Sequence, residues 1–323
     1  MELIRAFQAA AQRLSVRLEV HGADATPLCP AIHFVDRPHV TPTIVSGKYT
    51  DALLQIVRTE KINLLVPLID SELQSVAQAA AKLARLGCRA VISSPGVVRT
   101  CRDKMRTFEV LTKAGIDTPQ TWAWKTALRR RRHQFPYYLK PRTGSAAMGN
   151  YVVRNRAELA VFGKLVPDAI VQEFVEGVEH TLDIYTGFDG VPRCVVPRRR
   201  LEVRTGEVSK GVVVKDAAIM DVGRRVAEML GECRGVITVQ CMVTRRGRIR
   251  VIEINPRFGG GAPLSIHAGA GFPKWLLQEW LGDRPRIDPL GFRDGVAMLR
   301  YDESVFIDGA DTLTPFGAVN SDR

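Results

Sequence analysis

A short stretch near residue 250 carries side chains that could hold a metal ion and a phosphate. Glu253, Asn255 and Arg257 alternate along RIRVIEINPR, so all three would point to one face of an extended strand. The preceding segment GVITVQCMV would pair with it as a hairpin and bring Gln240 opposite. Mg²⁺ prefers hard oxygen ligands and shares others with substrate phosphates. We therefore predict that Gln240, Glu253 and Asn255 bind metal and that Arg257 grips a transferring phosphate.

The alternative is that these polar residues only form the solvated face of an edge strand. Against it, the sequence from Asn255 to Arg257, followed by Gly259–Gly261, is poor strand material. The loop therefore has another purpose, which favours the metal-site hypothesis.

Two further segments have the composition of a nucleotide site. Lys140 ends a strand-like run and is followed by the small-residue loop Gly144–Gly149, whose backbone N–H groups could close over phosphate oxygens. The loop lacks the Gly-Lys-Ser/Thr ending of a Walker A motif. In QEFVEGVEH, the extended backbone at 173–175 could pair with an adenine edge and Glu179 could accept from ribose hydroxyls. A charged strand–turn–strand explains the last segment equally well.

Composition sets limits on the function. The chain has 323 residues, is 46% hydrophobic and 25% charged, and can form two or three compact units. Its net charge of +12 and the run Arg129–Arg132 suggest nucleic-acid binding. The other basic residues are scattered, however, without interleaved aromatic residues, which favours a solvated face. No apolar run approaches the roughly 18 residues of a membrane span, and no signal peptide is evident, so we expect a cytoplasmic protein without membrane contact.

The first 97 residues alternate short apolar runs with helical patterns. Segments 17–24, 62–70 and 89–95 read as buried parallel strands and 71–87 as a helix, which together predict an open doubly wound sheet. The chain opens on a helix, whereas such sheets normally begin with a strand. We therefore expect the first strand to be missing, because the start lies too far downstream or because the sheet truly lacks it. Asp70 and Glu72 follow a strand end and are candidate substrate ligands, although helix capping would explain Asp70 as well.

The order of these motifs resembles the ATP-grasp superfamily. A lysine, a Gly-rich loop, E-F-V-E-G-x-E and then Q…E-x-N-P-R occur in that order over roughly residues 1–300. Within the superfamily, the chain is similar to the synthetase units of the carbamoyl phosphate synthetase large subunit and to stand-alone carboxylate–amine ligases, including the pyrrolysine-biosynthesis ligase.

The resemblance implies a fold that combines α/β and α+β parts. A Rossmann-like pre-ATP-grasp domain at 1–97, lacking its first strand, would precede a two-lobed ATP-grasp module. The small lobe with its lid loop would span 98–178 and the large lobe with the metal site 179–302, with a tail at 303–323.

The resemblance also assigns roles to residues of this sequence. For the nucleotide, it implies phosphate contacts at Lys104 and Lys140, an adenine hinge at Glu173, Phe174 and Val175, and a ribose acceptor at Glu179. It implies a lid loop around Gly144, Ser145 and Gly149. It assigns Gln240, Glu253 and Asn255 to two Mg²⁺ ions, with Mn²⁺ as a substitute, and Arg257 to the γ-phosphate. The cationic stretch 197–214 is similar to one beside the acyl-phosphate site. Arg199, Arg204 and Lys210 are candidates there, unless they only form a cationic strand.

The predicted activity is ATP-dependent joining of a small carboxylate to an amine through an acyl phosphate, with Lys140, Lys210 and Arg257 supplying charge. The chain departs from the large synthetase in having one ATP-grasp unit, no glutaminase and no leading strand. Alternatives are carboxyphosphate or carbamoyl chemistry in a split complex, a nucleotide-binding regulator and a nucleic-acid binder. A homodimer would fit the resembling family.

Overall fold

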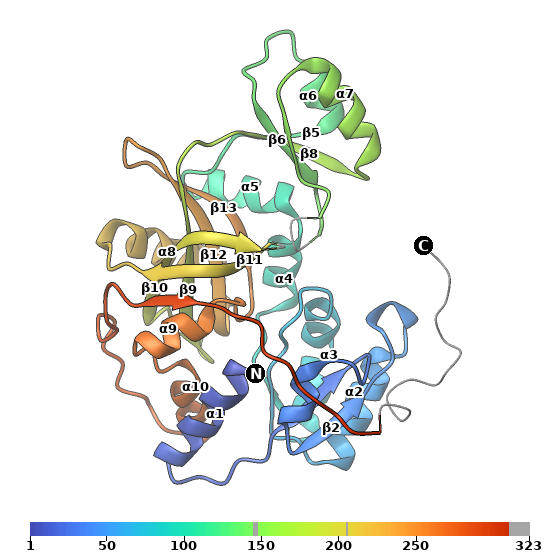
Figure 1. Cartoon of the computed structure of the whole chain (residues 1–323), viewed down its shortest axis with the longest axis vertical. Coiled ribbons are helices and arrows are strands. Elements are labelled where there is room, and N and C mark those ends of the chain that lie inside the picture. Colours follow the sequence, from blue (N-terminus) through green and yellow to red (C-terminus); the bar gives the residue numbers. More distant parts are fainter. Residues whose placement is uncertain (145–147, 205, 310–323) are drawn as a thin grey trace.

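A computed structural model of the chain describes residues 1–144, 148–204 and 206–309 (Figure 1). The N-terminal part contains short strands and the helices that cover them. Its elements are α1 (Glu2–Arg13), β1 (His21–Asp24), η1 (Pro30–Phe34), β2 (Arg37–Val40), η2 (Ile44–Ser46), α2 (Tyr49–Thr59), β3 (Leu64–Leu65), α3 (Leu73–Arg85) and β4 (Arg89–Ala90). The apolar faces of α2 and α3 meet in one buried cluster that includes Leu53, Val57 and Leu83. This packing explains why the Ala- and Leu-rich pattern forms helices there.

The strands of this part pair in parallel, as predicted, but they are shorter than the apolar runs. β1 pairs with β2 and β3 with β4, in two separate two-stranded sheets. The run 62–70 contributes only Leu64 and Leu65 to a strand.

The middle of the chain forms a small lobe, which stands apart at the top of Figure 1. Two helices, α4 (Pro95–Arg102) and α5 (Lys104–Lys113), lead into it, followed by β5 (Thr121–Ala123), α6 (Trp124–Leu128), β6 (Tyr137–Pro141), β7 (Tyr151–Val153), α7 (Arg156–Leu165) and β8 (Ala169–Glu173). The sheet order is β5-β8-β6-β7, and α6 and α7 share a buried cluster with it. α4 and α5 are separated at Asp103, whose carboxylate caps α5 by accepting from Met105 N and Arg106 N.

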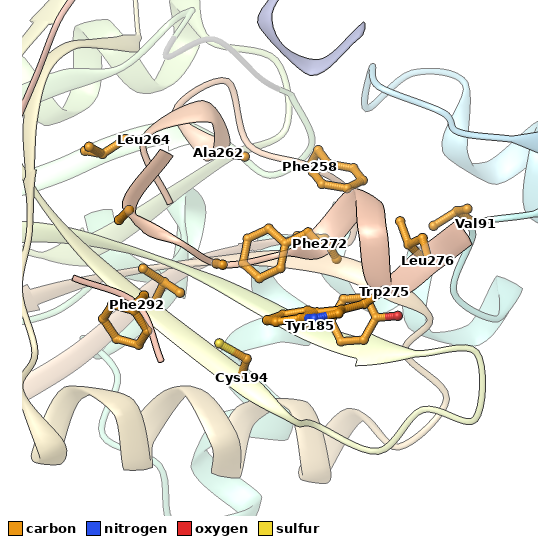
Figure 2. Close-up of a cluster of buried hydrophobic side chains, with 14 of the residues drawn as sticks. Val91, Tyr185, Cys194, Phe258, Ala262, Leu264, Phe272, Trp275, Leu276 and Phe292 are labelled. Atoms are coloured by element: carbon orange, nitrogen blue, oxygen red, sulfur yellow. The ribbon is translucent and has the colours of Figure 1, made fainter. Parts of the chain in front are cut away.

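A six-stranded sheet forms the large lobe. Its elements are β9 (Val178–Gly187), β10 (Cys194–Arg204), β11 (Glu207–Val213), α8 (Ala217–Leu230), β12 (Gly235–Val243), β13 (Ile249–Asn255), α9 (Ala262–Ala268), α10 (Phe272–Trp280) and β14 (Ala297–Leu299), with strand order β13-β12-β9-β10-β11-β14. On one side of the sheet α8 covers an aliphatic cluster. Figure 2 shows the cluster that α10 forms with the sheet, in which Phe272 and Trp275 lie beside Tyr185.

Strand register determines which polar residues share a face of this sheet. Gln240 lies opposite Glu253 on β13 and opposite Thr181 on β9, and Thr181 in turn lies opposite Arg198 on β10. A glutamate, a glutamine, a threonine and an arginine thus form a row across four neighbouring strands. The hairpin predicted for Gln240 and Glu253 is confirmed in its register. No described helix is both long and apolar enough to cross a bilayer.

Candidate nucleotide and metal site

A large open cleft lies between the small lobe, the large lobe and the N-terminal part. Its volume is about 1430 Å³, and both lobes and the N-terminal part contribute to its lining. The predicted site residues that line it are Asp70, Lys104, Lys140, Gly144, Glu173, Phe174, Val175, Glu179, Gln240, Glu253, Asn255 and Arg257. Segments almost 190 residues apart in sequence therefore contribute to one space.

Two lysines and a glutamate form the charged centre of the cleft. Lys104, at the start of α5, lies with its Nζ 3.6 Å from Glu253 Oε1 and donates to Gly144 O at 2.9 Å. Lys140, on β6, is buried, and burial lowers the pKa of its ammonium to about 8, although the charge of Glu253 opposes this shift. Lys104 adds to the lowering by like-charge repulsion. An anion between the two lysines would relieve that repulsion.

The metal-ligand candidates meet beside this centre. With its amide oriented to match its neighbours, Gln240 donates to Glu253 Oε2 at 3.1 Å and accepts from Arg200 Nη1 at 2.7 Å. Arg200 Nη1 also donates to Glu179 Oε1 at 2.8 Å. Burial raises the pKa of Glu179, the nearby Glu253 adds to the rise, and Arg200 opposes it. Arg200 therefore hydrogen-bonds both to Glu179, the predicted ribose acceptor, and to Gln240, a predicted metal ligand.

The donor set fits a hard divalent cation. Glu253, Gln240 and Asn255 offer carboxylate and amide oxygens at one side of the cleft, and all three line it. No other cluster competes with it, since the described residues contain no group of three or more His, Cys, Asp or Glu side chains that could hold a metal ion. The arrangement matches an ion that completes its shell with substrate phosphates.

The hinge segment is fixed by an ion pair to the large lobe. Glu173, the last residue of β8, accepts from Arg250 Nη2 at 2.8 Å, and this hydrogen bond lowers the pKa of its carboxyl group. Phe174 and Val175 follow the end of β8 and line the cleft. The backbone edge at 173–175 is therefore held at the cleft wall, as an adenine contact would require.

Arg257 is held by the N-terminal part of the chain. Its Nε and Nη2 donate to the two Asp70 oxygens at 2.7 Å each, and its side chain is only 15% exposed. A bidentate pair fixes the plane of the guanidinium. Asp70 thus acts here as an anchor for Arg257, in contrast to the predicted substrate contact, and it is not the N-cap of α3, a position that Glu72 occupies.

The cationic residues predicted on the antiparallel hairpin lie outside the cleft. Arg199 is exposed on the face opposite Arg198 and Arg200, because neighbouring strand residues point to opposite sides. Arg204 pairs with Asp302 at 3.2 Å on the surface, and Lys210 pairs with Glu202 at 2.7 Å. None of the three lines the cleft, so the roles predicted for Arg199, Arg204 and Lys210 do not fit their positions.

Three other predicted residues have different surroundings from those expected. Glu72 accepts from Leu68 N, Ile69 N and Tyr49 Oη, and so stabilises its own loop. Gly149 has a positive φ of 72° and packs near Pro141, outside the cleft lining. Ser145 lies outside the described residues.

Sequence reasoning missed Arg198, Arg200 and Glu207, which all line the cleft. Arg198 is buried and donates from Nε and Nη2 to Asp183 at 2.7 and 3.0 Å, while its Nη1 has no partner among the described residues. The run P-R-R-R gave no signal for these arginines, because both faces of the strand carry one. Glu207 could have been found only from the strand pairing that turns it toward the glycine loop.

Two family models match parts of this chain. The family model described as ATP-grasp domain matches residues 101–261, and the one described as PylC-like, N-terminal domain matches residues 1–92. The 3-methyl-D-ornithine–L-lysine ligase of Methanosarcina mazei is 25% identical over 175 residues. That match covers 54% of this chain and 43% of the ligase, so this chain spans less than half of that relative.

Solved structures share the fold at low identity. The biotin carboxylase domain of Hydrogenobacter thermophilus 2-oxoglutarate carboxylase has a TM-score of 0.72 at 16% identity, covering 91% of this chain and 70% of that one. The L-amino acid ligase from Bacillus licheniformis has a TM-score of 0.65 at 19% identity, covering 86% and 71%. These matches confirm the predicted fold class, an N-terminal α/β domain followed by a two-lobed module.

Proposed function

We propose that this chain, which carries a PylC-like N-terminal domain followed by an ATP-grasp domain, is an ATP-dependent ligase that joins a small carboxylate to an amine. The observation that carries the proposal is the meeting of Lys104, Lys140 and Glu253 in one cleft with Gln240 beside them. The similarity to a named amino-acid ligase supports the same reaction class.

ATP supplies the phosphoryl group that activates the carboxylate, and Mg²⁺ neutralises its charge. Glu253, Gln240 and Asn255 would hold the metal, and we retain the prediction of two Mg²⁺ ions, with Mn²⁺ as a substitute. Lys104 and Lys140 would bind the phosphates, while Glu173, Phe174, Val175 and Glu179 would bind the nucleoside.

The chain's own contribution is to position charge and to exclude water. Arg257, fixed by Asp70, presents a guanidinium toward the same cleft and would hold the reacting carboxylate or its phosphate. Gly144, near Lys104, would belong to a loop that covers the phosphates. No side-chain nucleophile is required, since the acyl phosphate is itself the activated species.

A hydroxylamine capture assay tests the proposal. The chain is incubated with Mg-ATP, hydroxylamine and, one at a time, the standard amino acids and bicarbonate, and hydroxamate and phosphate are measured. We expect one class of acid to give both products. Glu253→Gln should lower the rate by about 100-fold, because it removes the charged ligand of the Mg²⁺ that would neutralise the phosphoryl group.

The matched control for this assay is Glu202→Gln, a substitution of an exposed glutamate outside the cleft, which should keep the wild-type rate. If no acid produces hydroxamate while ATP still binds, ligase chemistry is excluded. The predicted homodimer is tested separately by light scattering of the purified chain.

A further inference from the structure

The cleft continues beyond the metal residues toward a glycine loop that follows Arg257. Gly259, Gly260 and Gly261 line this second half of the cleft, together with Glu207 and Arg300. If the proposed ligase reaction holds, the carboxylate to be activated must lie near Arg257, and the amine must approach from the side away from the nucleotide. The second half of the cleft is where that approach is open.

Glu207 lies directly against the glycine loop. A Cβ atom added at Gly260 would come within 1.9 Å of Glu207 Oε2, so the carboxylate occupies the space that any side chain at 260 would need. Gly260 in turn accepts a hydrogen bond from Arg300 Nη2. The absence of a side chain at residue 260 is therefore what allows the Glu207 carboxylate to reach the loop next to Arg257.

The Glu207 carboxylate also keeps its capacity to accept hydrogen bonds. Its nearest cation is Arg300 Nη1, 3.9 Å from Oε2, which is beyond hydrogen-bonding distance. The other cleft carboxylates of the described chain are mostly engaged: Asp70 with Arg257, Glu179 with Arg200, Glu173 with Arg250, Glu253 with Lys104 and Glu2 with Arg5. Glu303 also lines the cleft and is exposed, beyond the end of β14.

The negative charge of Glu207 determines which kind of ligand can bind beside it. A second carboxylate or a phosphate would be repelled by Glu207, whereas an ammonium group would gain a charge-assisted hydrogen bond. Burial lowers the pKa of the Arg257 guanidinium, Asp70 outweighs this effect, and the charge of Glu207 is near enough to add to the rise. The negative charge of Glu207 thus interacts with Arg257, beside which the acyl phosphate would form.

We propose that Glu207 binds the ammonium group of the acceptor amine and holds it against the Gly259–Gly261 loop, facing the activated carboxyl carbon. The ammonium loses one proton to bulk solvent through the open cleft. The nitrogen lone pair then forms the C–N bond, the C–O electron pair leaves with phosphate, and the leaving phosphate takes the second N–H proton. Glu207 is in this sense a specificity residue for cationic amines.

The test compares amine-dependent turnover with hydroxylamine capture in Glu207→Gln. Hydroxylamine is unprotonated near neutral pH, so its attack on the acyl phosphate does not need an ammonium site. With the acid found above, ammonium and each standard amino acid serve as acceptors. We expect Glu207→Gln to raise the KM for the acceptor amine by about tenfold or more, the loss of one charged hydrogen bond. Hydroxamate formation and the KM for the acid should stay at wild-type levels.

The matched control is Glu202→Gln, an exposed glutamate on the preceding strand that lies outside the cleft and should change neither reading. Unchanged amine KM in Glu207→Gln would overturn the inference, and so would loss of hydroxamate formation, which would place Glu207 on the acid side. A wild-type chain that forms hydroxamate but responds to no amine would overturn it as well. Failure of the proposed function is distinct, because the wild type would then form no hydroxamate at all.

Discussion

Lys140 is a buried cation that faces a space suited to a polyanion. Burial and the neighbouring Lys104 both disfavour its charged form, and its pKa falls to about 8. A triphosphate would favour the charged form again and raise the pKa. Binding of ATP should therefore be coupled to protonation of this one residue.

We predict proton uptake on ATP binding that grows with pH. At about pH 9 the free Lys140 is mostly neutral and becomes charged in the complex, so uptake approaches one proton; at about pH 7 it is already charged and contributes almost none. Calorimetry in buffers of different ionisation enthalpy measures this number. Lys140→Arg should abolish the pH-dependent uptake, because arginine stays charged.

Lys210→Arg provides the matched control, since Lys210 is exposed and paired with Glu202 outside the cleft. It should show the uptake of the wild type. Equal uptake in wild type and Lys140→Arg would mean that another group takes the proton.

Site residues could be predicted where the sequence pattern that marks them depends only on nearby residues. Glu253, Asn255 and Gln240 were found because strand alternation depends only on neighbouring residues and one hairpin turn. The run Arg198–Arg200 could not be resolved in the same way, because each face of the strand carries an arginine. Its orientation is set by pairing with β9, and the register shift after Arg200 moves Arg204 and Lys210 off the cleft side.

At the scale of elements, the glycine loop between β13 and α9 has little room for side chains. A Cβ added at Gly261 would come within 2.2 Å of Arg198 Nη1 and 2.6 Å of Val208 Cγ1. Arg198 cannot swing away easily, because Asp183 holds it bidentately and Ser265 donates to the same carboxylate at 2.6 Å. The buried ion pair therefore fixes how closely α9 approaches the sheet.

Gly261→Ala should destabilise the chain by about 1–3 kcal/mol, because the added methyl must displace a buried, hydrogen-bonded guanidinium. Urea unfolding followed by fluorescence measures the change. Gly96→Ala is the control, since its Cβ would meet only Ser94 Oγ at 3.7 Å within helix α4. That substitution should be neutral or stabilising by up to about 1 kcal/mol. A Gly261→Ala chain as stable as wild type would mean that the loop relaxes freely.

Helices and strands could be predicted where the sequence pattern was long, and the prediction was wrong where tertiary contacts determine the local structure. The amphipathic run 71–87 became α3, and 271–282 became α10, because each buries one continuous apolar face. The apolar run 62–70 was expected to be a full strand, yet only two of its residues pair. Glu72 accepts from Leu68 N and Ile69 N, so side-chain contacts replace the sheet ladder there.

At the scale of the whole molecule, the N-terminal part is joined to the large lobe by apolar packing and by polar contacts. Val91 lies beside Leu276 in the cluster of Figure 2. Ser94 N donates to Glu232 O at 3.1 Å, and Arg234 N donates to Ser93 Oγ at 3.2 Å. Asp70 and Arg257, which line the cleft, join the same two sequence-distant parts, so this wall of the cleft depends on how firmly they are held together.

The Asp70–Arg257 pair should therefore control how tightly this wall is held. In Asp70→Asn the mostly buried guanidinium keeps Phe258 O as an acceptor but loses its bidentate, oppositely charged partner. We expect a loss of about 1–3 kcal/mol in local stability, seen as faster hydrogen exchange at 66–72 and 255–262. Arg102 of α4 donates to Asp70 O, so α4 should also exchange faster, whereas the small-lobe sheet β5-β8-β6-β7 should exchange as in wild type. Asp283→Asn, at an exposed aspartate beyond α10, should leave all regions unchanged. Faster exchange across the whole chain would instead show that the pair supports global folding.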